Sequence, residues 1–228
     1  MTRSMLDQKL EYLQDEILSL GSMVEKAVRD SVDSLKQRDL DRATLIIAED
    51  RAINEKRFDI EREALTLVAR QQPVATDLRQ IAAILEIATE LERIGDYAKS
   101  VAKVSLTIGE EPLIKPLIDI PRMTEVVCGM LRRALDAFLN RDVELARSLP
   151  ASDDEVDALY NQVYRELLTM MFSNPRIIDQ ASHLLMIAHN LERAGDRIVN
   201  ICERVVFTVT GEMVEMDIEN RLDPSNMH

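Results

Sequence analysis

The stretch LERIGD at residues 91–96 returns 100 positions later as LERAGD at residues 191–196, with a single residue changed. Upstream of each copy, the pair Arg-Asp at residues 38–39 returns at residues 141–142. The offset falls from 103 to 100 between these marks, which indicates a small deletion in a loop, where length changes are absorbed. The chain is therefore an internal duplication, and we expect its two halves to share one architecture.

The composition of the chain is typical of helical proteins. Its 228 residues are 46% hydrophobic and include 6 Gly, 7 Pro, 4 Tyr, 4 Phe and no Trp. Leu, Ala, Ile, Glu and Arg are abundant, and these residues favour helices, whereas the aromatic residues that strands prefer are scarce. The hydrophobic content is ample for a packed core. We therefore exclude a disordered chain and an all-β fold.

Sparse Pro, Gly and Arg-Asp marks separate six long stretches whose apolar residues recur at helical spacing. We expect helices at residues 4–37, 40–71, 75–108, 122–140, 142–173 and 176–210. Short connections force neighbouring helices to fold back on each other. The predicted fold class is all-α, a tandem repeat of two antiparallel three-helix bundles. The predicted domains are a first bundle at 1–110, a proline-bearing linker at 111–121, a second bundle at 122–212 and an acidic tail at 213–228.

The charge and the cysteine content limit the possible partners and compartments. The formal net charge of -13 would repel nucleic acid and anionic lipid, so we expect no nucleic-acid partner. No apolar run approaches the roughly 20 residues of a membrane-spanning helix, so we expect no direct membrane insertion. Cys128 and Cys202 are too few and too isolated for a disulfide framework. We expect two buried, unreactive thiols in a cytoplasmic protein.

Polar residues interrupt the apolar face of the second helix in each half. Asp50 and Asn54 fall inside the apolar arc of the first half, and Asp153 and Asp157 fall inside that of the second. A carboxylate on a core-facing stripe is costly unless it is paired, hydrogen-bonded or bound to a cation. Each of these side chains therefore needs a partner.

Antiparallel pairing supplies those partners. A turn near Pro73 places Asp50 level with Asp96 and Asn54 level with Glu92. The turn at residues 174–175 creates the same arrangement in the second half, so two acidic clusters are expected. The first acidic cluster is Asp50, Asn54, Glu92 and Asp96, and the second is Asp153, Asp157, Glu192 and Asp196. Such oxygen ligands favour Mg, Ca, Mn or iron over structural zinc.

A structural interpretation of the same acids stays open. They could pair with Lys or Arg, and Lys99, three residues after Asp96, is a local candidate. His189 precedes Glu192 by three residues and could add an imidazole ligand, but a polar contact is the simpler interpretation because Thr89 replaces it in the first half. No nucleotide-binding, nucleophile-elbow or HExxH motif occurs, and the chain shows no nucleophile beside a base.

Several motifs resemble those of the PhoU family of phosphate-signalling proteins. They are PVATDLR at 73–79, LERIGD at 91–96, the stretch 190–196, NICE at 200–203 and VTGE at 209–212. The resemblance extends over residues 5–212 and implies two three-helix bundles. It also implies that the two acidic clusters bind metal, commonly iron or zinc in that family. Asn54 departs from the family's acidic pattern and lowers the charge of the first cluster.

The resemblance further implies a function. Members of the family are cytoplasmic regulators that link the phosphate ABC transporter, through its ATPase, to a sensor histidine kinase, and they keep phosphate-starvation genes off when phosphate is plentiful. We expect the same role here, exerted by protein binding and without catalysis. We also expect a homodimer or higher oligomer, and a peripheral contact with the membrane only through protein partners.

Two other functional classes remain open from the residues alone. The duplicated clusters could belong to a metal-dependent or metal-handling enzyme, which would require an open coordination position beside a substrate pocket. Alternatively, the chain could be a purely structural adaptor whose acids are paired with basic side chains. Metal analysis separates the adaptor from the other two, and a phosphate-ester hydrolysis assay separates the enzyme from the regulator.

Overall fold

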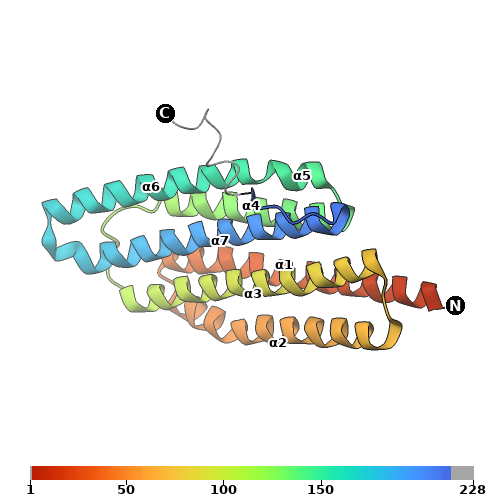
Figure 1. Ribbon diagram of the computed structural model, residues 1–228. Helices are drawn as coiled ribbons and strands as arrows, with labels where there is room; N and C mark the ends of the chain where they lie inside the picture. The colour runs from red at the N-terminus through yellow and green to blue at the C-terminus, as the bar shows by residue number, and fades with distance from the viewer. Residues whose placement is uncertain (1, 217–228) are drawn as a thin grey trace, which may run out of the picture.

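The computed structural model describes residues 2–216, and within this range the chain consists of helices and their connecting loops and has no strand. The first bundle consists of α1 (Thr2–Gln37), α2 (Leu40–Gln71) and α3 (Ala75–Ile108). The second consists of α4 (Asp119–Asn140), α5 (Val143–Ser148), α6 (Pro150–Ser173), the short 3₁₀ helix η1 (Pro175–Ile177) and α7 (Ile178–Thr210). The predicted fold class is confirmed: each half is an antiparallel three-helix bundle (Figure 1).

One helix differs from the expectation. The stretch 142–173, expected as one helix, is broken at Leu149 into α5 and α6. Pro150 stands at the first position of α6 and has no N–H to donate to the carbonyl of Ala146. That carbonyl instead accepts from Leu149 N at 3.3 Å, the tighter spacing of a 3₁₀ turn. The break lets the fully buried Leu149 turn into the core.

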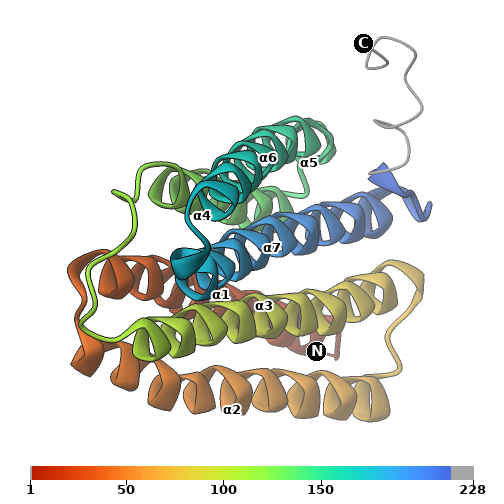
Figure 2. The same cartoon turned by 90° about the vertical axis from the view of Figure 1, so that its left-hand side faces the viewer.

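The two bundles lie side by side and share an interface of four helices. α3 packs along α7 and α1 packs along α4, whereas α2 and α6 lie on opposite outer sides (Figure 2). Most of the buried apolar side chains of the two bundles belong to one continuous core, and Ala43, Ile46 and Ala102 form a small cluster apart from it. Each bundle therefore completes its own three-helix packing and also buries a second face against its neighbour.

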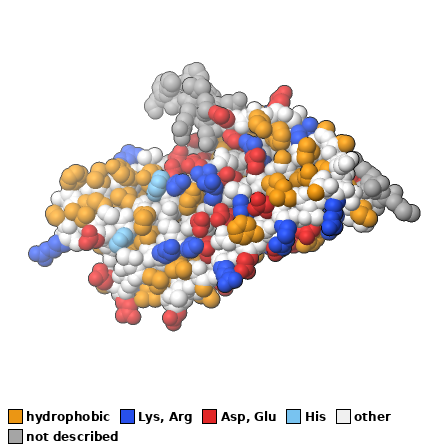
Figure 3. Space-filling model, turned by 60° about the horizontal axis from the view of Figure 1, so that its bottom comes forward, with side chains coloured by type: hydrophobic (Ala, Val, Ile, Leu, Met, Phe, Trp, Pro, Cys, Tyr) orange, Lys and Arg blue, Asp and Glu red, His pale blue; other side chains and the backbone are white. Residues whose placement is uncertain are grey.

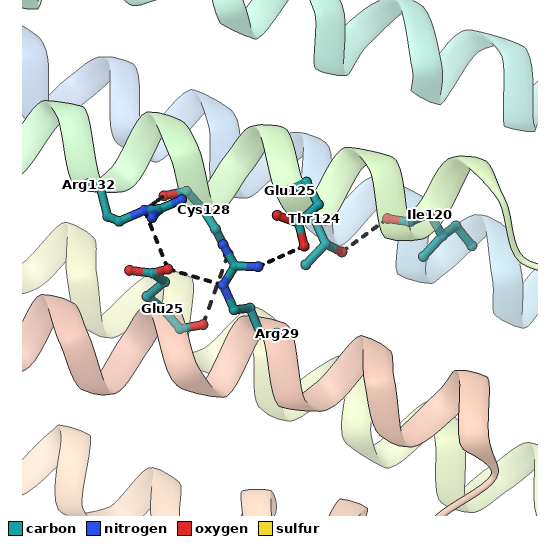
Figure 4. A network of polar contacts seen from close by, with 7 residues as sticks. All are labelled: Glu25, Arg29, Ile120, Thr124, Glu125, Cys128 and Arg132. Carbon is teal, nitrogen blue, oxygen red and sulfur yellow. Dashed lines mark hydrogen bonds and ion pairs between the residues drawn. The ribbon is translucent and has the colours of Figure 1, made fainter.

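Polar contacts also join the bundles. Between α1 and α4, Arg29 lies 2.7 Å from Glu125, and Arg132 lies 3.5 Å from Glu25 (Figure 4). Within α1, Arg29 also lies 3.1 Å from Glu25 and so links the two pairs. The Cys128 thiol faces the Glu25 carbonyl within this network. Because these ion pairs bridge two helices that also pack through apolar residues, they fix the register of the interface.

Two remaining features of the fold are the character of its helices and the path of the chain after α7. None of the helices in residues 2–216 combines the length and the apolar character that a bilayer crossing requires. Met216 is buried, and its N–H donates to Glu203 Oε1 at 2.9 Å, so the chain after α7 folds back onto that helix. The rest of the predicted acidic tail, residues 217–228, lies outside the described part of the chain. The predicted domain boundaries stay a prediction.

Candidate functional site

The first acidic cluster joins α2 to α3 through a lysine. Asp50 is 6% exposed, and its Oδ2 lies 2.6 Å from Lys99 Nζ. The same ammonium lies 3.7 Å from Asp96 Oδ1. Asn54 donates from Nδ2 to Asp50 Oδ2 at 3.1 Å. Through Lys99, Asp50 of α2 is linked to the part of α3 that carries Asp96.

Glu92 belongs to the same electrostatic group. Its partial burial raises the pKa of its carboxyl above the ordinary value, and the neighbouring charges of Asp96 and Asp50 raise it further. Arg57 and Arg93 act in the opposite direction. The repulsion between acids is thus met by basic side chains, with Lys99 placed between two carboxylates where a metal cation would have served the same electrostatic purpose.

The second acidic cluster joins α6 to α7 by a closer contact. Asp153 is 8% exposed, and its carboxylate rests on Gly195 so tightly that a Cβ at that glycine would overlap with Oδ1. This contact places Asp153 beside the 195–196 level of α7, again as the antiparallel register predicts. A glycine in the repeated LERxGD motif therefore serves to admit a carboxylate into the helix pair.

The pKa of Glu192 reflects the negative charge that the other acids of the second acidic cluster place around it. Burial raises the pKa of Glu192, and the charges of Asp196 and Asp157 raise it further. His189 Nδ1 lies 3.2 Å from Glu192 Oε2 and acts against this rise. The imidazole is thus a polar partner of Glu192, as the sequence comparison of the two halves favours.

The metal assignment stays a prediction. Within residues 2–216, no three His, Cys, Asp or Glu side chains are already gathered around one point as metal ligands. Carboxylate charges nevertheless interact across each helix pair, Asp50 with Glu92 and Asp157 with Glu192. The donor set is all oxygen, which suits hard cations. Of the two, the second acidic cluster fits a cation better by composition, because it has four carboxylates where the first has three carboxylates and Asn54.

Two further features of the second acidic cluster escaped the sequence interpretation. The ring of Tyr160 stacks at a tilt against His189, with 6.0 Å between the ring centroids. Its hydroxyl has a raised pKa, because it is partly buried and faces the negative charge of Glu192. The signal was available, since Tyr160 follows Asp157 by three residues on one helix face, but tyrosine on an apolar arc is typical of core packing.

The two thiols are buried as expected. Cys128 is 1% exposed and Cys202 is fully buried. Desolvation raises the pKa of each thiol to about 12. Each thiol is therefore protonated at neutral pH and is a poor nucleophile.

Comparison with known proteins identifies the duplication. The PhoU domain family matches this chain twice, at residues 17–105 and 120–205. The phosphate-specific transport system accessory protein PhoU homolog of Clostridium acetobutylicum is 36% identical over 95% of this chain and 100% of its own length. The homolog of the same name from Caulobacter vibrioides is 39% identical over 90% of each chain.

Solved structures agree with the sequence relatives. The crystal structure of PhoU from Pseudomonas aeruginosa superposes with a TM-score of 0.85 at 35% identity, covering 90% of this chain and 99% of that one. The phosphate transport system regulatory protein PhoU from Streptococcus pneumoniae gives a TM-score of 0.86 at 32% identity, covering 92% and 99%. The similarity therefore extends over both bundles and over their arrangement.

Proposed function

The chain belongs to the PhoU family, and from this premise we propose that it is an accessory regulator of phosphate uptake that acts by binding other proteins. The observation that carries the proposal is the match along essentially the whole length of a relative named as an accessory protein of the phosphate-specific transport system. Both the chain's internal repeats take part in that match. A whole-length match supports a shared role better than a match to one domain would.

The proposed partners are the ATPase of the phosphate ABC transporter and a sensor histidine kinase, both reached at the cytoplasmic face of the membrane. When phosphate is plentiful, the chain would hold the kinase in the state that keeps starvation genes off. A net charge of -13 supports attraction to basic segments of such partners. The two thiols, buried and protonated, support a role without covalent catalysis.

A pull-down tests the proposed partners. The tagged chain is expressed in phosphate-replete cells that lack their own copy, and the recovered proteins are identified by mass spectrometry. We expect the transporter ATPase or the kinase to be enriched, and starvation-gene expression to be repressed. The control bait is Leu20→Asp, which puts a charge at a fully buried position and should not fold. Equal recovery with both baits, or unrepressed starvation genes, contradicts the proposal.

We also propose that the second acidic cluster binds a metal ion, with Asp153, Asp157, Glu192 and Asp196 as the residues that would hold it. The raised pKa of Glu192 supports this, because a cation would relieve the repulsion from Asp157 and Asp196. A bound ion would supply positive charge for docking acidic groups of a partner. Iron, zinc, Mg, Mn and Ca are the ions to test.

Metal content after dialysis against each ion distinguishes the clusters. We expect the double variant Glu192→Ala/Asp196→Ala to lose most of the bound metal. The matched variant Glu92→Ala/Asp96→Ala should lose less, because Lys99 already neutralises the first acidic cluster. Unchanged metal content in the Glu192→Ala/Asp196→Ala variant returns the second acidic cluster to the salt-bridge interpretation.

The manner of docking can be tested on the same complex. A contact made by surface charge weakens as salt rises, because the Debye length falls from about 10 Å at 0.1 M to about 3 Å at 1 M. A contact bridged by metal resists salt and yields to a chelator. Insensitivity to both would point to apolar recognition. Hydrophobic side chains gather at one end of the face drawn in Figure 3. Near the turn between α6 and α7, Phe172 is 81% exposed and Ile178 is also exposed.

A further inference from the structure

The first bundle contains a cavity of about 290 Å³ between its three helices. Apolar groups make up most of its wall: Met23 and Ala27 from α1, Ile46 and Ile53 from α2, and Gly95 from α3. Of the first acidic cluster, only Asp50 lines it. The cavity therefore adjoins the first acidic cluster at the Asp50–Lys99 pair and extends from there along apolar side chains.

Small residues create this cavity and divide the core around it. Ala43, Ile46 and Ala102 form a separate apolar cluster on one side, while Ile53 belongs to the main core on the other. Protein interiors are otherwise close-packed, with few voids larger than a water molecule. An opening of this size in the middle of a long bundle therefore needs an explanation.

The second bundle shows how the same position is filled. At the equivalent places in the repeat, Met130 replaces Ala27, Leu149 replaces Ile46 and Val199 replaces Lys99. Met130, Leu149 and Val199 are all at most 1% exposed. The larger methionine and the inward turn at Leu149 occupy the space that is open in the first bundle. The duplicated fold can therefore close this position, and the first bundle leaves it open.

The charged side chains of the cavity are already paired. Lys26 and Glu49 lie 3.1 Å apart, with side chains 60% and 49% exposed, and they form the solvent side of the opening. Lys99 and Asp50 lie 2.6 Å apart at the α2–α3 side. Because each cation has its carboxylate, a charged ligand would gain no free partner. A neutral ligand could still donate a hydrogen bond to a carboxylate oxygen.

We propose that this cavity is a binding site for a small neutral aromatic molecule of about the size of indole. An apolar cavity of roughly 150 Å³ already admits benzene, so 290 Å³ accommodates a two-ring compound. The occupant is a free small molecule, since three helices line the site and leave one side open to solvent, where the Lys26–Glu49 pair lies. A side chain of the chain's own tryptophan is excluded, because the sequence contains none.

The absence of tryptophan also makes the test direct, because added indole is the only indole fluorophore in the sample. We expect its emission to shift to the blue on titration with the purified chain, with a Kd on the order of 0.1 mM. Ala27→Met copies the filled second bundle and should weaken binding by about tenfold or more. The matched control, Ala69→Met, adds the same side chain at an exposed position of α2 and should bind like the wild type.

A second cavity-filling variant and two charged analogues of indole complete the binding experiment. If Ala27→Met does not fold by circular dichroism, Ile46→Phe fills the same cavity. Indole-3-acetate and tryptamine should bind more weakly than indole, because their charges meet no free partner. Equal affinity in the wild type and a folded filling variant overturns the proposal, as does stronger binding of either charged analogue. Binding of a tryptophan-containing peptide without binding of indole would reassign the site to a partner protein and also overturn it.

Discussion

At the scale of single residues, three helical glycines meet different neighbours. A Cβ at Gly195 would overlap with the Asp153 carboxylate, and a Cβ at Gly95 would lie 3.2 Å from an Ile53 methyl group. A Cβ at Gly129 would meet nothing within 4 Å. Only the first of these glycines is required by a buried charged group, so the duplicated LERxGD motif has different consequences in its two copies.

Alanine substitutions should reveal this difference. Gly129→Ala should stabilise the protein by about 0.5–1 kcal/mol, because alanine favours helix over glycine. Gly195→Ala should destabilise it by about 1–3 kcal/mol, since the buried carboxylate must move. Gly95→Ala should fall between them. Urea unfolding followed by circular dichroism gives the three values, and a stabilised Gly195→Ala variant would show that Asp153 does not depend on that glycine.

The raised pKa of Glu192 has a consequence for stability as pH changes. A carboxyl whose pKa is higher in the folded state than its ordinary 4.5 opposes folding once it ionises. The penalty is absent below the ordinary value and is complete above the raised one. Glu192→Gln removes it, so the variant should gain free energy of unfolding relative to the wild type as pH rises from 4 to 7. Denaturation at several pH values measures this, and parallel curves would contradict it.

At the scale of helices, the repeated Arg-Asp pair is a turn. Arg38 and Arg141 end their helices in the left-handed conformation, with φ of 58° and 54°. Asp39 and Asp142 then begin the next helix, each accepting a backbone N–H at 2.9 Å. The repeated Arg-Asp pair therefore reflects the same turn geometry in both halves and stabilises the fold. The acids of the two acidic clusters lie instead inside the helices, α2 and α3 in the first half and α6 and α7 in the second.

Loss of either cap should weaken its helix. Asp39→Ala and Asp142→Ala should each lower the free energy of unfolding by about 1 kcal/mol, because each leaves a backbone N–H at the helix start without its acceptor. Asparagine also caps helices well, so Asp39→Asn and Asp142→Asn are the matched controls and should stay close to the wild type. Thermal and urea unfolding report both effects. Equal losses for alanine and asparagine would assign the effect to charge instead.

The helices and their antiparallel pairing are the part of the structure that the sequence predicts best. Periodicity and turn residues predict the long helices, and an antiparallel register that places Asp50 near residues 96–99 and Asp153 near residues 195–196. The break at Leu149 was missed although Pro150 signals it. Pro150 lies inside the helix expected at 142–173, where proline interrupts the hydrogen-bond ladder, and in the structure it stands at the start of α6. The Lys99 contacts were available as an alternative, but sequence spacing alone does not decide between a lysine and a metal ion.

At the scale of the whole molecule, the sequence gives no account of how the bundles meet. Their interface depends on close contacts between distant residues: Leu135 of α4 packs onto Gly21 of α1, where a Cβ would overlap with it. Across α3 and α7, Arg197 lies 3.4 Å from Glu90, and the Arg193 guanidinium stacks over Tyr97 at 4.9 Å. Such pairings join positions about 100 residues apart, beyond the reach of local periodicity.

This interface makes the two bundles one cooperative unit. The main apolar core continues from one bundle into the other. Opening the first bundle exposes the faces of α4 and α7 that it covers, and opening the second exposes those of α1 and α3. We therefore expect one unfolding transition in urea. Tyr12→Trp in α1 and Tyr160→Trp in α6 provide separate fluorescent reporters in a chain without native tryptophan. Their midpoints should coincide with each other and with circular dichroism. Gly21→Leu, which forces α1 away from Leu135, should lower the midpoint of this common transition. Two distinct midpoints would show that each repeat unfolds independently. In that case Gly21→Leu should leave the midpoint of the second bundle unchanged.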